Sequence, residues 1–485
     1  MTAEHVLTPA PTAYRWRWPA LAALLLGEAM NLLDATIVQV ASPAIHADLG
    51  GSVSDIQWFT AAYTLPFAVL LITGGRLGDI AGRKRLFVIG VTGFMLASAA
   101  CALAPSVGLL ITFRVLQGAA AAVIIPQTIG LIKAMFTGPE VSRALGSIGP
   151  VMGLAAVCGP VLGGVLTHAD LFGSSWRAVF LVNVPLSLAV LAISPRLPEN
   201  RAPRRPTLDL TGTLLATAGI GLVVHPLIGA DLSALPGWSW GAVVAGLGLM
   251  AVFAAHQRRV AGAGRSPLVE PSLFAHRGFP AALVTSTSFF AVTNGLMTVV
   301  VLQLQLGAGV GVLKAGLTLA PWSVGLAVAS WIAGAHLVER YGRRVMTLGL
   351  AVLSVGALSA IAVYRAAAAD PGSYPTPLPL ALGVVGAGVG LFTPAFFTAA
   401  LKPLRPQEIG SAAGLLNAVQ QLGATLGVAV LGSVYLGGAS SGDAGLSAVR
   451  PAVWGAVALV VVSFGASRLM VDASASASAE GGTGR

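Results

Sequence analysis

Long apolar stretches recur along the whole chain and alternate with short polar loops. A helix that crosses a membrane needs about 20 consecutive apolar residues. About fourteen stretches meet this requirement, near residues 19–43, 56–75, 86–105, 107–131, 143–167, 177–194, 209–229, 239–256, 279–304, 313–336, 345–363, 377–400, 408–434 and 450–470. The stretches 209–229 and 239–256 are the least distinct, and the count falls to twelve or thirteen if they are merged or misassigned. The pattern predicts an all-α protein that crosses a membrane many times.

Composition and charge support this interpretation. Of 485 residues, 55% are hydrophobic and only 9% are charged, whereas soluble domains carry about 25% charged residues. With the N-terminus inside, twenty-three Lys and Arg residues fall in the termini and loops of that side, and four fall on the other. This asymmetry follows the positive-inside rule. We therefore expect both termini in the cytoplasm and basic loops that face anionic lipid rather than nucleic acid. The chain has four Lys against twenty-four Arg, with abundant Ala and Gly, which is typical of a GC-rich bacterial genome, so we expect a bacterial inner membrane.

A short repeat indicates two related halves. The segment 77–84 (LGDIAGRK) reappears as 337–344 (LVERYGRR), each time in a tight loop between two apolar stretches. Repeated halves are the usual plan of secondary transporters. The expected units are a six-helix bundle over residues 1–195, a linker with two inserted helices over 196–265, a second six-helix bundle over 266–470 and a disordered cytoplasmic tail over 471–485.

The first apolar stretch carries a polar stripe. At 100° per residue, Glu28, Asn31, Asp34 and Gln39 fall within an arc of roughly 140° on one side of a helix. A carboxylate inside a membrane costs roughly 2.5–3.5 kcal/mol on insertion scales, and folding alone gives no reason for it. We interpret Asp34 as an acid that couples transport to protons; the alternative is an interhelical hydrogen bond with a structural role only. Glu28 is a second candidate, and the sequence leaves open which acid is the principal one.

The stretch 107–131 carries Arg114 and, one turn later, Gln117. An intramembrane charge needs a counter-charge or a wet cavity, and Asp34 and Glu28 are the only other charges expected at this depth. We therefore expect Arg114 to lie near Asp34. Burial favours the neutral form of an acid whereas a nearby Arg favours its charged form, so helix movement can load and unload a proton. The alternative is a permanent structural ion pair.

Several amides are candidates for a substrate cavity, because such cavities are mainly apolar with a few polar anchors. The candidate cavity residues are Asn31, Gln117, Gln303, Asn417 and Gln420. Each of these amides could instead bridge two helices, and the sequence does not separate the two roles.

The loop after the second stretch is a candidate gate. It needs a tight turn, which Gly permits, and a carboxylate there can pair with loop Arg residues or with a helix N-terminus of the other half. The candidate gating loop contains Gly75, Asp79, Gly82, Arg83 and Lys84. The alternative is simple anchoring of the topology by positive charge.

The fifth stretch is a candidate hinge. Small residues at four-residue spacing permit close helix approach, and a proline bends the helix. The candidate hinge contains Gly159, Pro160, Gly163 and Gly164. The alternative is simple packing, since Gly is common in membrane helices.

The sequence lacks the signatures of an enzyme or of an ATP-driven pump. It has no Gly-rich loop followed by Gly-Lys-Ser/Thr, no His/Cys cluster with metal spacing and no nucleophile elbow. We therefore expect no cofactor and a protein driven by the proton motive force. A membrane enzyme or a sensor would need a reactive cluster or a large hydrophilic stretch, and the longest hydrophilic stretch is near 20 residues.

Together these motifs resemble the major facilitator superfamily and, within it, the fourteen-helix drug:proton antiporter family. The matching segments are 33–43 (LDATIVQVASP), 57–63 (QWFTAAY), 75–84 (GRLGDIAGRK), 110–118 (LITFRVLQG), 159–164 (GPVLGG) and 176–185 (WRAVFLVNVP). The chain departs from the family pattern at four places: Gln39 stands for Asn, Ser42 for Leu, Ala155 for Gly, and Gln303 for Tyr. These departures lie near the expected cavity or hinge and bear on the substrate range.

The resemblance implies two six-helix bundles plus two inserted helices, and proton-coupled efflux of amphipathic small molecules such as drugs or antibiotics. It also implies that Asp34 couples protons, that Arg114 supports the coupling and that Asp79 with Arg83 gates the pathway. A narrow-specificity metabolite, amino-acid or osmolyte transporter of the same fold is the alternative, followed by a non-transporting sensor. The expected partners are a small-molecule substrate, protons and the lipid bilayer, without nucleic acid, and we expect a monomer.

Overall fold

The computed structural model describes residues 14–170, 173–201, 207–228, 236–275, 278–369, 375–440, 446 and 448–480. Within these residues, fourteen helices are long and apolar enough to cross a membrane. The fourteen expected spans are therefore confirmed, including the two least distinct ones, which correspond to Leu210–Leu227 and Gly237–Gly262.

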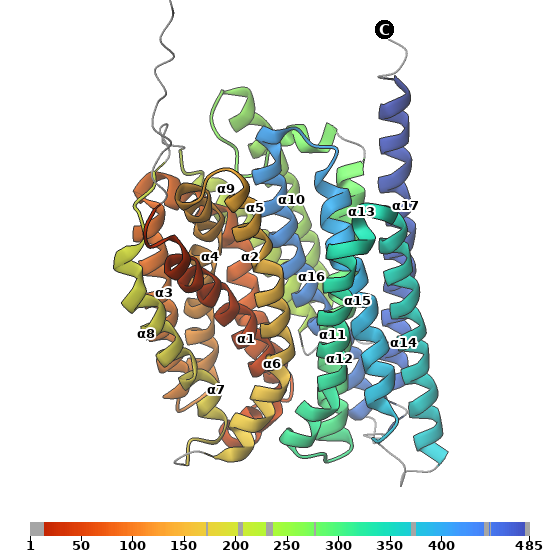
Figure 1. Ribbon diagram of the computed structural model, residues 1–485. Coiled ribbons are helices and arrows are strands. Elements are labelled where there is room, and N and C mark those ends of the chain that lie inside the picture. Colours follow the sequence, from red (N-terminus) through yellow and green to blue (C-terminus); the bar gives the residue numbers. More distant parts are fainter. Residues whose placement is uncertain are drawn as a thin grey trace, which may run out of the picture.

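The first half of the chain forms the red-to-yellow group of helices on the left of Figure 1. The short helices α5 and α7 extend α6 and α8, so this half contributes six spans. Its helices are α1 (Arg17–Leu49), α2 (Asp55–Ala81), α3 (Arg83–Ala102), α4 (Val107–Met135), α5 (Pro139–Gly146), α6 (Ile148–Ala169), α7 (Ala178–Leu181) and α8 (Asn183–Ile193). The inserted helices α9 (Leu210–Val224) and α10 (Gly237–Gly262) follow and pack against each other.

The second half forms the green-to-blue group on the right of Figure 1 and also contributes six spans. Its helices are α11 (Gly278–Leu302), α12 (Val312–Ile332), α13 (Val338–Tyr341), α14 (Arg343–Ala369), α15 (Leu378–Leu401), α16 (Pro406–Ser440) and α17 (Val449–Glu480). A π-helical turn, Gln303–Gly307, extends α11, and a second one, Ala333–Leu337, joins α12 to α13.

The end of the chain differs from the expected disordered tail. We expected disorder from residue 471, but α17 continues to Glu480. The added segment alternates Ala with Ser, and Ala has the highest helix propensity of all residues. Extending an existing helix also avoids the cost of starting a new one. Residues 481–485 lie outside the described part of the chain.

The two repeated loops contain the tight turns that their glycines permit. Gly82 separates α2 from α3 with a φ of 109°, and Gly342 separates α13 from α14 with a φ of 54°. Both values lie in the region that residues with a Cβ rarely adopt. The repeat therefore places equivalent backbone turns in the two halves.

Equivalent helices also pack alike in the two halves. In the first half, α2 packs on α4, where Gly118 lies against the backbone carbonyl of Tyr63. In the second half, α12 packs on α15, where Gly386 lies against the backbone carbonyl of Trp322. Glycine permits such backbone-to-backbone approach because it has no Cβ. The internal symmetry thus extends from the loops to the helix contacts.

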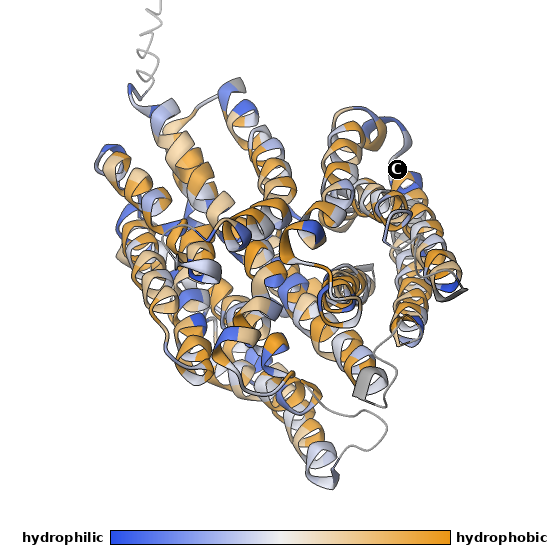
Figure 2. Cartoon of the chain, turned by 90° about the horizontal axis from the view of Figure 1, so that it is seen from below, coloured by the Kyte–Doolittle hydropathy of each residue, from blue (hydrophilic) through white to orange (hydrophobic). Residues whose placement is uncertain are grey.

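The two halves meet along two seams, α2 with α16 and α6 with α12, and α1 also contacts α11. The inserted helix α9 contacts both α2 and α16, so the inserted pair lies at the α2–α16 seam. Large apolar side chains point outward: Leu96 on α3 is 61% exposed, Leu214 on α9 is 69% exposed and Val355 on α14 is 57% exposed. Figure 2 shows hydrophobic colouring along helices throughout the bundle, as a lipid-facing surface requires.

Candidate functional site

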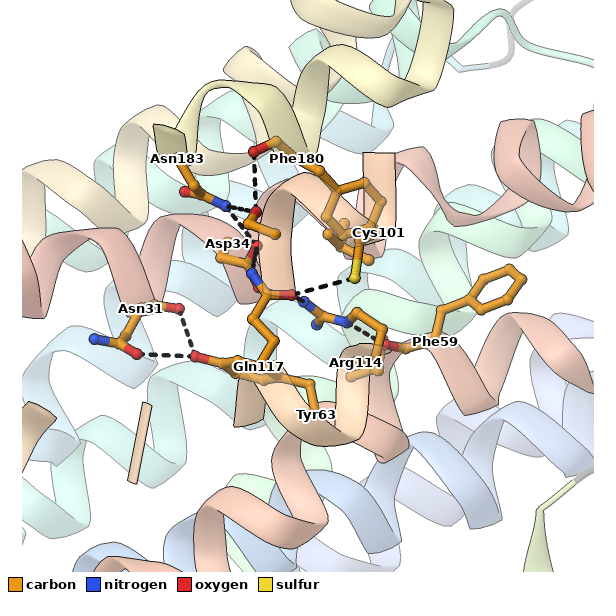
Figure 3. A network of polar contacts seen from close by, with 12 residues as sticks. Asn31, Asp34, Phe59, Tyr63, Cys101, Arg114, Gln117, Phe180 and Asn183 are labelled. Carbon is orange, nitrogen blue, oxygen red and sulfur yellow. Dashed lines mark hydrogen bonds and ion pairs between the residues drawn. The ribbon is translucent and has the colours of Figure 1, made fainter. Parts of the chain in front are cut away.

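Asp34 and Arg114 form an ion pair in the interior of the first half (Figure 3). Asp34 lies in the middle of α1 and Arg114 lies on α4, and neither residue has exposed surface. The two charges therefore lie together, as the sequence led us to expect. An ion pair without access to water is favourable only when further hydrogen bonds satisfy both partners.

The carboxylate of Asp34 receives those additional bonds from two amides. Gln117 Nε2 donates to Asp34 Oδ1 at 2.9 Å, and Asn183 Nδ2 donates to the same oxygen at 2.8 Å. Arg114 Nη1 binds the other oxygen. Three donors from α4 and α8 thus converge on one carboxylate of α1 and satisfy both of its oxygens.

The guanidinium of Arg114 is held from several sides. Its Nε donates to the backbone carbonyl of Phe59 on α2 at 3.0 Å, and its Nη1 also donates to Gln117 Oε1 at 2.8 Å. The ring of Tyr63 lies against it, with the guanidinium carbon 4.4 Å from the ring centre. Its Nη2 has no hydrogen-bond partner among the described residues. The described residues therefore leave one nitrogen of this buried guanidinium without a hydrogen bond.

Asn183 connects the acid to α3 and to α7. Besides Asp34, its Nδ2 donates to Ser98 Oγ at 3.0 Å, and Ser98 Oγ donates to the carbonyl of Phe180 at 2.9 Å. The centre thus draws on side chains or carbonyls of α1, α2, α3, α4, α7 and α8. No sequence pattern singled out Asn183, Ser98 or Tyr63, although Asn183 and Tyr63 lie within motifs that carried the resemblance.

The second acid of the stripe has a different environment. Glu28 is only 7% exposed, and within the described part of the chain its carboxylate forms no ion pair. Thr128 on α4 is its polar neighbour. Between the two acids, Asn31 Oδ1 accepts a hydrogen bond from the Tyr63 hydroxyl at 3.1 Å. Asp34 therefore has a charged partner, whereas among the described residues Glu28 has none.

Three of the five candidate cavity residues are enclosed by helix packing. Gln117 has no exposed surface and is bonded to Asp34 and Arg114, so it belongs to the ionic centre. Asn31 and Gln303 are also buried, at 4% and 1% exposure. Gln117 therefore bridges two helices, which is the alternative that the sequence left open, and a role of the three buried amides in a substrate cavity stays a prediction.

The other two candidate cavity residues lie on α16. Asn417 and Gln420 are both half-buried. Neither of them forms a hydrogen bond to another described residue. Helix bridging by these two amides is therefore not seen among the described residues, and their role in a substrate cavity stays a prediction.

Two glutamines bridge the halves between α1 and the α11 segment. Gln39 Nε2 donates to Thr298 Oγ1 at 2.6 Å, and Gln305 Nε2 donates to the carbonyl of Val40 at 2.8 Å. Gln39 lies on the polar stripe of the first stretch, and the sequence pattern predicted no partner for it. Its partner lies 259 residues away along the chain, a separation over which helix periodicity carries no information.

The charged residues of the gating loop bind partners within the first half of the chain. Arg83 Nη2 binds Asp79 Oδ1 at 2.6 Å, and Lys84 Nζ donates to the carbonyl of Pro195 at 2.8 Å. Of the two pairings that the sequence left open for Asp79, the one with a loop Arg is present among the described residues.

The glycines of the gating loop lie against other parts of the first half and the linker. A Cβ atom at Gly75 would lie 3.4 Å from Pro126 of α4. The turn at Gly82 lies beside the side chain of Glu199, which also accepts the backbone N–H of Lys84 at 3.2 Å. The loop is therefore anchored on both sides of its turn.

The candidate hinge packs on α1 with one side of α6. Gly159 faces Thr36, and a Cβ atom at Gly163 would lie 2.8 Å from the carbonyl oxygen of Ile37. The two glycines therefore let the backbone of α6 approach the helix that carries Asp34.

The other side of the hinge packs on α12. A Cβ atom at Gly164 would lie 3.0 Å from the carbonyl oxygen of Val312 at the start of α12. One at Gly316 would lie 2.6 Å from the carbonyl oxygen of Pro160. The backbones of α6 and α12 are therefore in close contact at this end of the seam.

Towards the start of α6 the two helices separate. A Cβ atom at Gly153 would lie 3.8 Å from the Cβ of Ala327, and one at Gly149 would have no neighbour within 4 Å. The α6–α12 seam is therefore tight at the end of α6 and loose at its start.

Comparison with known proteins agrees with this architecture. The family model described as Major Facilitator Superfamily matches residues 24–211 and 209–428. The chain therefore belongs to the major facilitator superfamily.

Within the described ranges, no group of three or more His, Cys, Asp or Glu side chains is placed to hold a metal ion.

Three curated relatives match over most of their length. The chain is 44% identical over 428 residues to a probable actinorhodin transporter of Streptomyces coelicolor, covering 88% of this chain and 74% of that protein. It is 36% identical over 434 residues to puromycin resistance protein pur8 of Streptomyces alboniger, covering 87% and 82%. It is 34% identical over 436 residues to the tetracenomycin C resistance and export protein of Streptomyces glaucescens, covering 88% and 77%.

Solved structures show the same fold. A bacterial homologue of the human lysosomal transporter Spinster, in an inward-facing and unoccupied conformation, matches with a TM-score of 0.68 at 17% identity, covering 95% of this chain and 98% of that one. A structure of the peptide transporter POT gives a TM-score of 0.65 at 15% identity, covering 93% and 95%. At such identities the likeness concerns the fold alone.

Proposed function

We propose that this protein exports amphipathic small molecules of the antibiotic type from a bacterial cell in exchange for protons, by alternating access. The single observation that carries the coupling is the buried carboxylate of Asp34, bound by Arg114, Gln117 and Asn183. Export is supported by relatives that are named as transporters or resistance proteins for actinorhodin, puromycin and tetracenomycin C. These names also provide the first candidate substrates.

The orientation rests on the charge pattern. The start of α1 and the end of α17 lie at the same end of the bundle in Figure 1, and the positive-inside rule assigns that end, with the basic loops at Gly82 and Gly342, to the cytoplasm. The tight contact of Gly164 with α12 then lies at the outer end, and the loose start of α6 lies at the inner end. In this orientation the space between the two halves opens toward the cytoplasm in the described conformation. We further propose that the protein works as a monomer.

The coupling follows from what a proton does to the Asp34 centre. Protonation would remove the negative charge that holds Arg114, Gln117 and Asn183 together, and a buried Arg without its counter-charge is strongly unfavourable. The centre must then rearrange, and α1 is the helix that carries the acid. Since α1 also packs on the hinge glycines of α6, its displacement moves α6 against α12. Protonation in one conformation and release in the other thereby drive the exchange.

The proton gradient provides enough free energy for this exchange. A proton that moves through 100 mV releases about 2.3 kcal/mol. At one proton per substrate this free energy concentrates a neutral substrate roughly fiftyfold, since each factor of ten costs about 1.4 kcal/mol. The protein therefore needs no other energy source for extrusion.

Transport into everted membrane vesicles tests the proposal. Vesicles that contain the protein are expected to accumulate puromycin or another candidate substrate when a proton gradient is imposed, and to lose this accumulation when the gradient is dissipated. Asp34→Asn is expected to abolish the accumulation. Asp48→Asn, on the same helix but bonded to Trp176 and Arg177 at its end, is the matched control and is expected to retain it.

A further inference from the structure

The two seams between the halves differ in chemistry. At the α2–α16 seam, the hydroxyls of Thr64 and Thr425 lie 2.7 Å apart, and Gln57 Nε2 lies 3.4 Å from Ser433 Oγ. The α6–α12 seam is instead closed by glycine contacts, as described for Gly164. The two threonine hydroxyls also donate to carbonyls of their own helices, those of Thr60 and Gln421. Lipid tails offer no hydrogen bonds, so lipid that enters the opened seam cannot replace the bond between Gln57 and Ser433, whereas a seam of glycines has no such bond to lose. Of the two seams, only the α2–α16 seam therefore needs to be shielded from lipid.

The inserted pair covers that polar seam. Val224, at the end of α9, and Ile228, just after it, form a buried apolar cluster with Ala61 of α2 and Ala429 of α16. These two alanines belong to the two helices of the seam, one from each half. The inserted pair therefore places apolar side chains where the seam would otherwise meet the bilayer.

The inserted pair is bonded to α2 near the start of α9. The hydroxyls of Thr73 and Thr213 lie 3.0 Å apart, and Arg76 Nη1 donates to the carbonyl of Ser266 at 2.6 Å. Arg76 follows Gly75 in the loop motif of the first half, so this motif is bonded to the linker after α10.

A second contact with α2 lies near the other end of α9. The rings of Trp58 on α2 and His225 lie 5.5 Å apart, and the ring of Trp238 on α10 lies 6.3 Å from the same histidine. The inserted pair is therefore held on α2 at both ends of α9.

The start of the inserted pair has an internal clamp. Asp209 caps α9 by accepting the Gly212 N–H at 2.8 Å, and it accepts from His256 Nε2 and Gln257 Nε2 of α10, each at 2.8 Å. Burial raises the pKa of Asp209, but the hydrogen bonds from His256, Gly212 and Gln257 outweigh this effect and leave the pKa below its usual value. Gln257 Oε1 also accepts the backbone N–H of Val269 at 3.2 Å. The clamp joins α9, α10 and the linker into one unit.

The polar contact of the inserted pair with α16 lies at one end of the seam. Ser433 Oγ donates to the carbonyl of Leu227 at 3.0 Å, close to its contact with Gln57. Among the described residues, no polar contact joins α9 or α10 to residues 409–425 of α16. Within the part of the chain that the structure describes, hydrogen bonds and ring contacts therefore join the inserted pair to α2 near both ends of α9, whereas the polar contact with α16 lies near one end only.

From this asymmetry we infer that α9 and α10 are a strap that belongs mechanically to the first half and shields the polar α2–α16 seam from lipid throughout the transport cycle. When the halves rock, the polar contacts of α16 with α2 and with the strap break. The contacts of the strap with α2 persist. The inference rests on the proposed function, because it needs two halves that move against each other.

Distances between spin labels on lipid-facing positions test the strap directly. Leu96→Cys on the first half, Leu214→Cys on α9 and Val355→Cys on the second half all replace exposed side chains. The labels are attached in pairs to the full-length protein in lipid nanodiscs, after the two natural cysteines, Cys101 and Cys158, are changed to Ala. The distances between the labels are measured at neutral and at acidic pH, and again in the Asp34→Asn variant. The Leu96–Val355 and Leu214–Val355 distances are expected to shift between conditions, and the Leu96–Leu214 distance is expected to stay constant.

Two outcomes would overturn the strap, and they differ from each other. If the Leu96–Leu214 distance shifts while the Leu214–Val355 distance stays constant, the inserted pair travels with the second half, although alternating access itself holds. If the Leu96–Val355 distance stays constant in every condition, the halves do not move, and both the proposed function and the strap are wrong.

A pair of matched disulfides adds a second measurement. A disulfide between Thr73→Cys and Thr213→Cys locks the inserted pair to α2, and one between Thr64→Cys and Thr425→Cys locks α2 to α16. The hydroxyls that the sulfur atoms replace are 3.0 Å and 2.7 Å apart, so the two sulfur atoms of each pair lie close together. Oxidation is expected to leave efflux unchanged in the first variant and to abolish it in the second, and reduction is expected to restore it. Equal loss of efflux in both oxidised variants, restored by reduction, would contradict the strap.

Discussion

The guanidinium carbon of Arg114 lies 4.4 Å from the centre of the Tyr63 ring, and the hydroxyl of the same tyrosine donates to Asn31 Oδ1 at 3.1 Å. Tyr63 therefore contacts both the charged centre and the polar stripe of α1 (Figure 3). Asn31 lies one turn from Asp34 and one turn from Glu28. The tyrosine is thus placed to transmit a rearrangement of the ion pair toward the second acid.

Separating the two contacts of Tyr63 gives the first prediction. Tyr63→Phe keeps the ring against Arg114 and removes the hydroxyl, so we expect a stability loss of about 1 kcal/mol, typical of one hydrogen bond, with the ion pair intact. Tyr63→Leu also removes the cation–π contact and is expected to cost more, since such contacts contribute about 2 kcal/mol when desolvated. Thermal unfolding in detergent measures both losses. Equal stability of the two variants would show that the ring contact contributes nothing.

Removing one partner of the ion pair should destabilise the protein more than removing both. Arg114→Gln leaves the Asp34 carboxylate buried without its counter-charge, and we expect a loss of about 3–5 kcal/mol. Asp34→Asn in the Arg114→Gln background removes the second charge and is expected to recover part of that loss. A double-mutant cycle from unfolding measurements gives the coupling energy. Additive losses would contradict a direct pair.

The tight end of the α6–α12 seam should not tolerate a side chain. Gly316→Leu places a large group where a Cβ atom already lies 2.6 Å from the carbonyl oxygen of Pro160, so we expect the seam to be forced apart and efflux to be lost. Gly149→Leu, on the loose end of α6, has room for the side chain and is expected to retain efflux. Accessibility of a cysteine at Leu313 to a water-soluble maleimide should rise only in the first variant. Unchanged accessibility there would contradict a closed outer seam.

The clamp at the start of the inserted pair predicts a pH dependence. The folded-state pKa of Asp209 lies below its usual value, so its stabilising contribution is complete above the unfolded-state value of about 3.9 and is lost as the pH falls through the folded-state value. Asp209→Asn is therefore expected to lower the melting temperature at neutral pH. The difference between wild type and variant is expected to shrink below about pH 4, which scanning calorimetry can follow; a difference that grows on acidification would have the wrong sign.

The architecture was largely predictable because membrane insertion imposes a strong pattern. A span must bury about 20 apolar residues, so even the weakest stretches, 209–229 and 239–256, correspond to helices α9 and α10. The pairing of Asp34 with Arg114 was also predictable, since a buried charge is far more stable beside its counter-charge than alone. The end of α17 was not predictable from low complexity, because the same Ala-rich composition that indicates disorder also favours helix.

The remaining parts of the site depend on the rotation of each helix in the bundle. Gln117 and Asn417 are both amides on apolar helices, yet Gln117 is bonded to the ion pair and Asn417 is half-buried without a bond to a described residue. Asn183 lies 149 residues from Asp34 along the chain. Periodicity gives the polar face of one helix but not the neighbour that the face meets, so such contacts could not be assigned in advance.

Proton movement in proteoliposomes measures the role of Asp34 most directly. Vesicles hold the purified protein and a pH-sensitive dye in weak buffer, and a gradient of a substrate identified by the vesicle assay is applied without any other driving force. The wild type is expected to move protons against the substrate flow, and Asp34→Asn, folded and still able to bind substrate, is expected to move none. Glu28→Gln, which removes the acid without a charged partner, is the comparison and is expected to keep the flux. Equal substrate-driven proton flux in Asp34→Asn and wild type would show that hydrogen ions do not pass through this carboxylate.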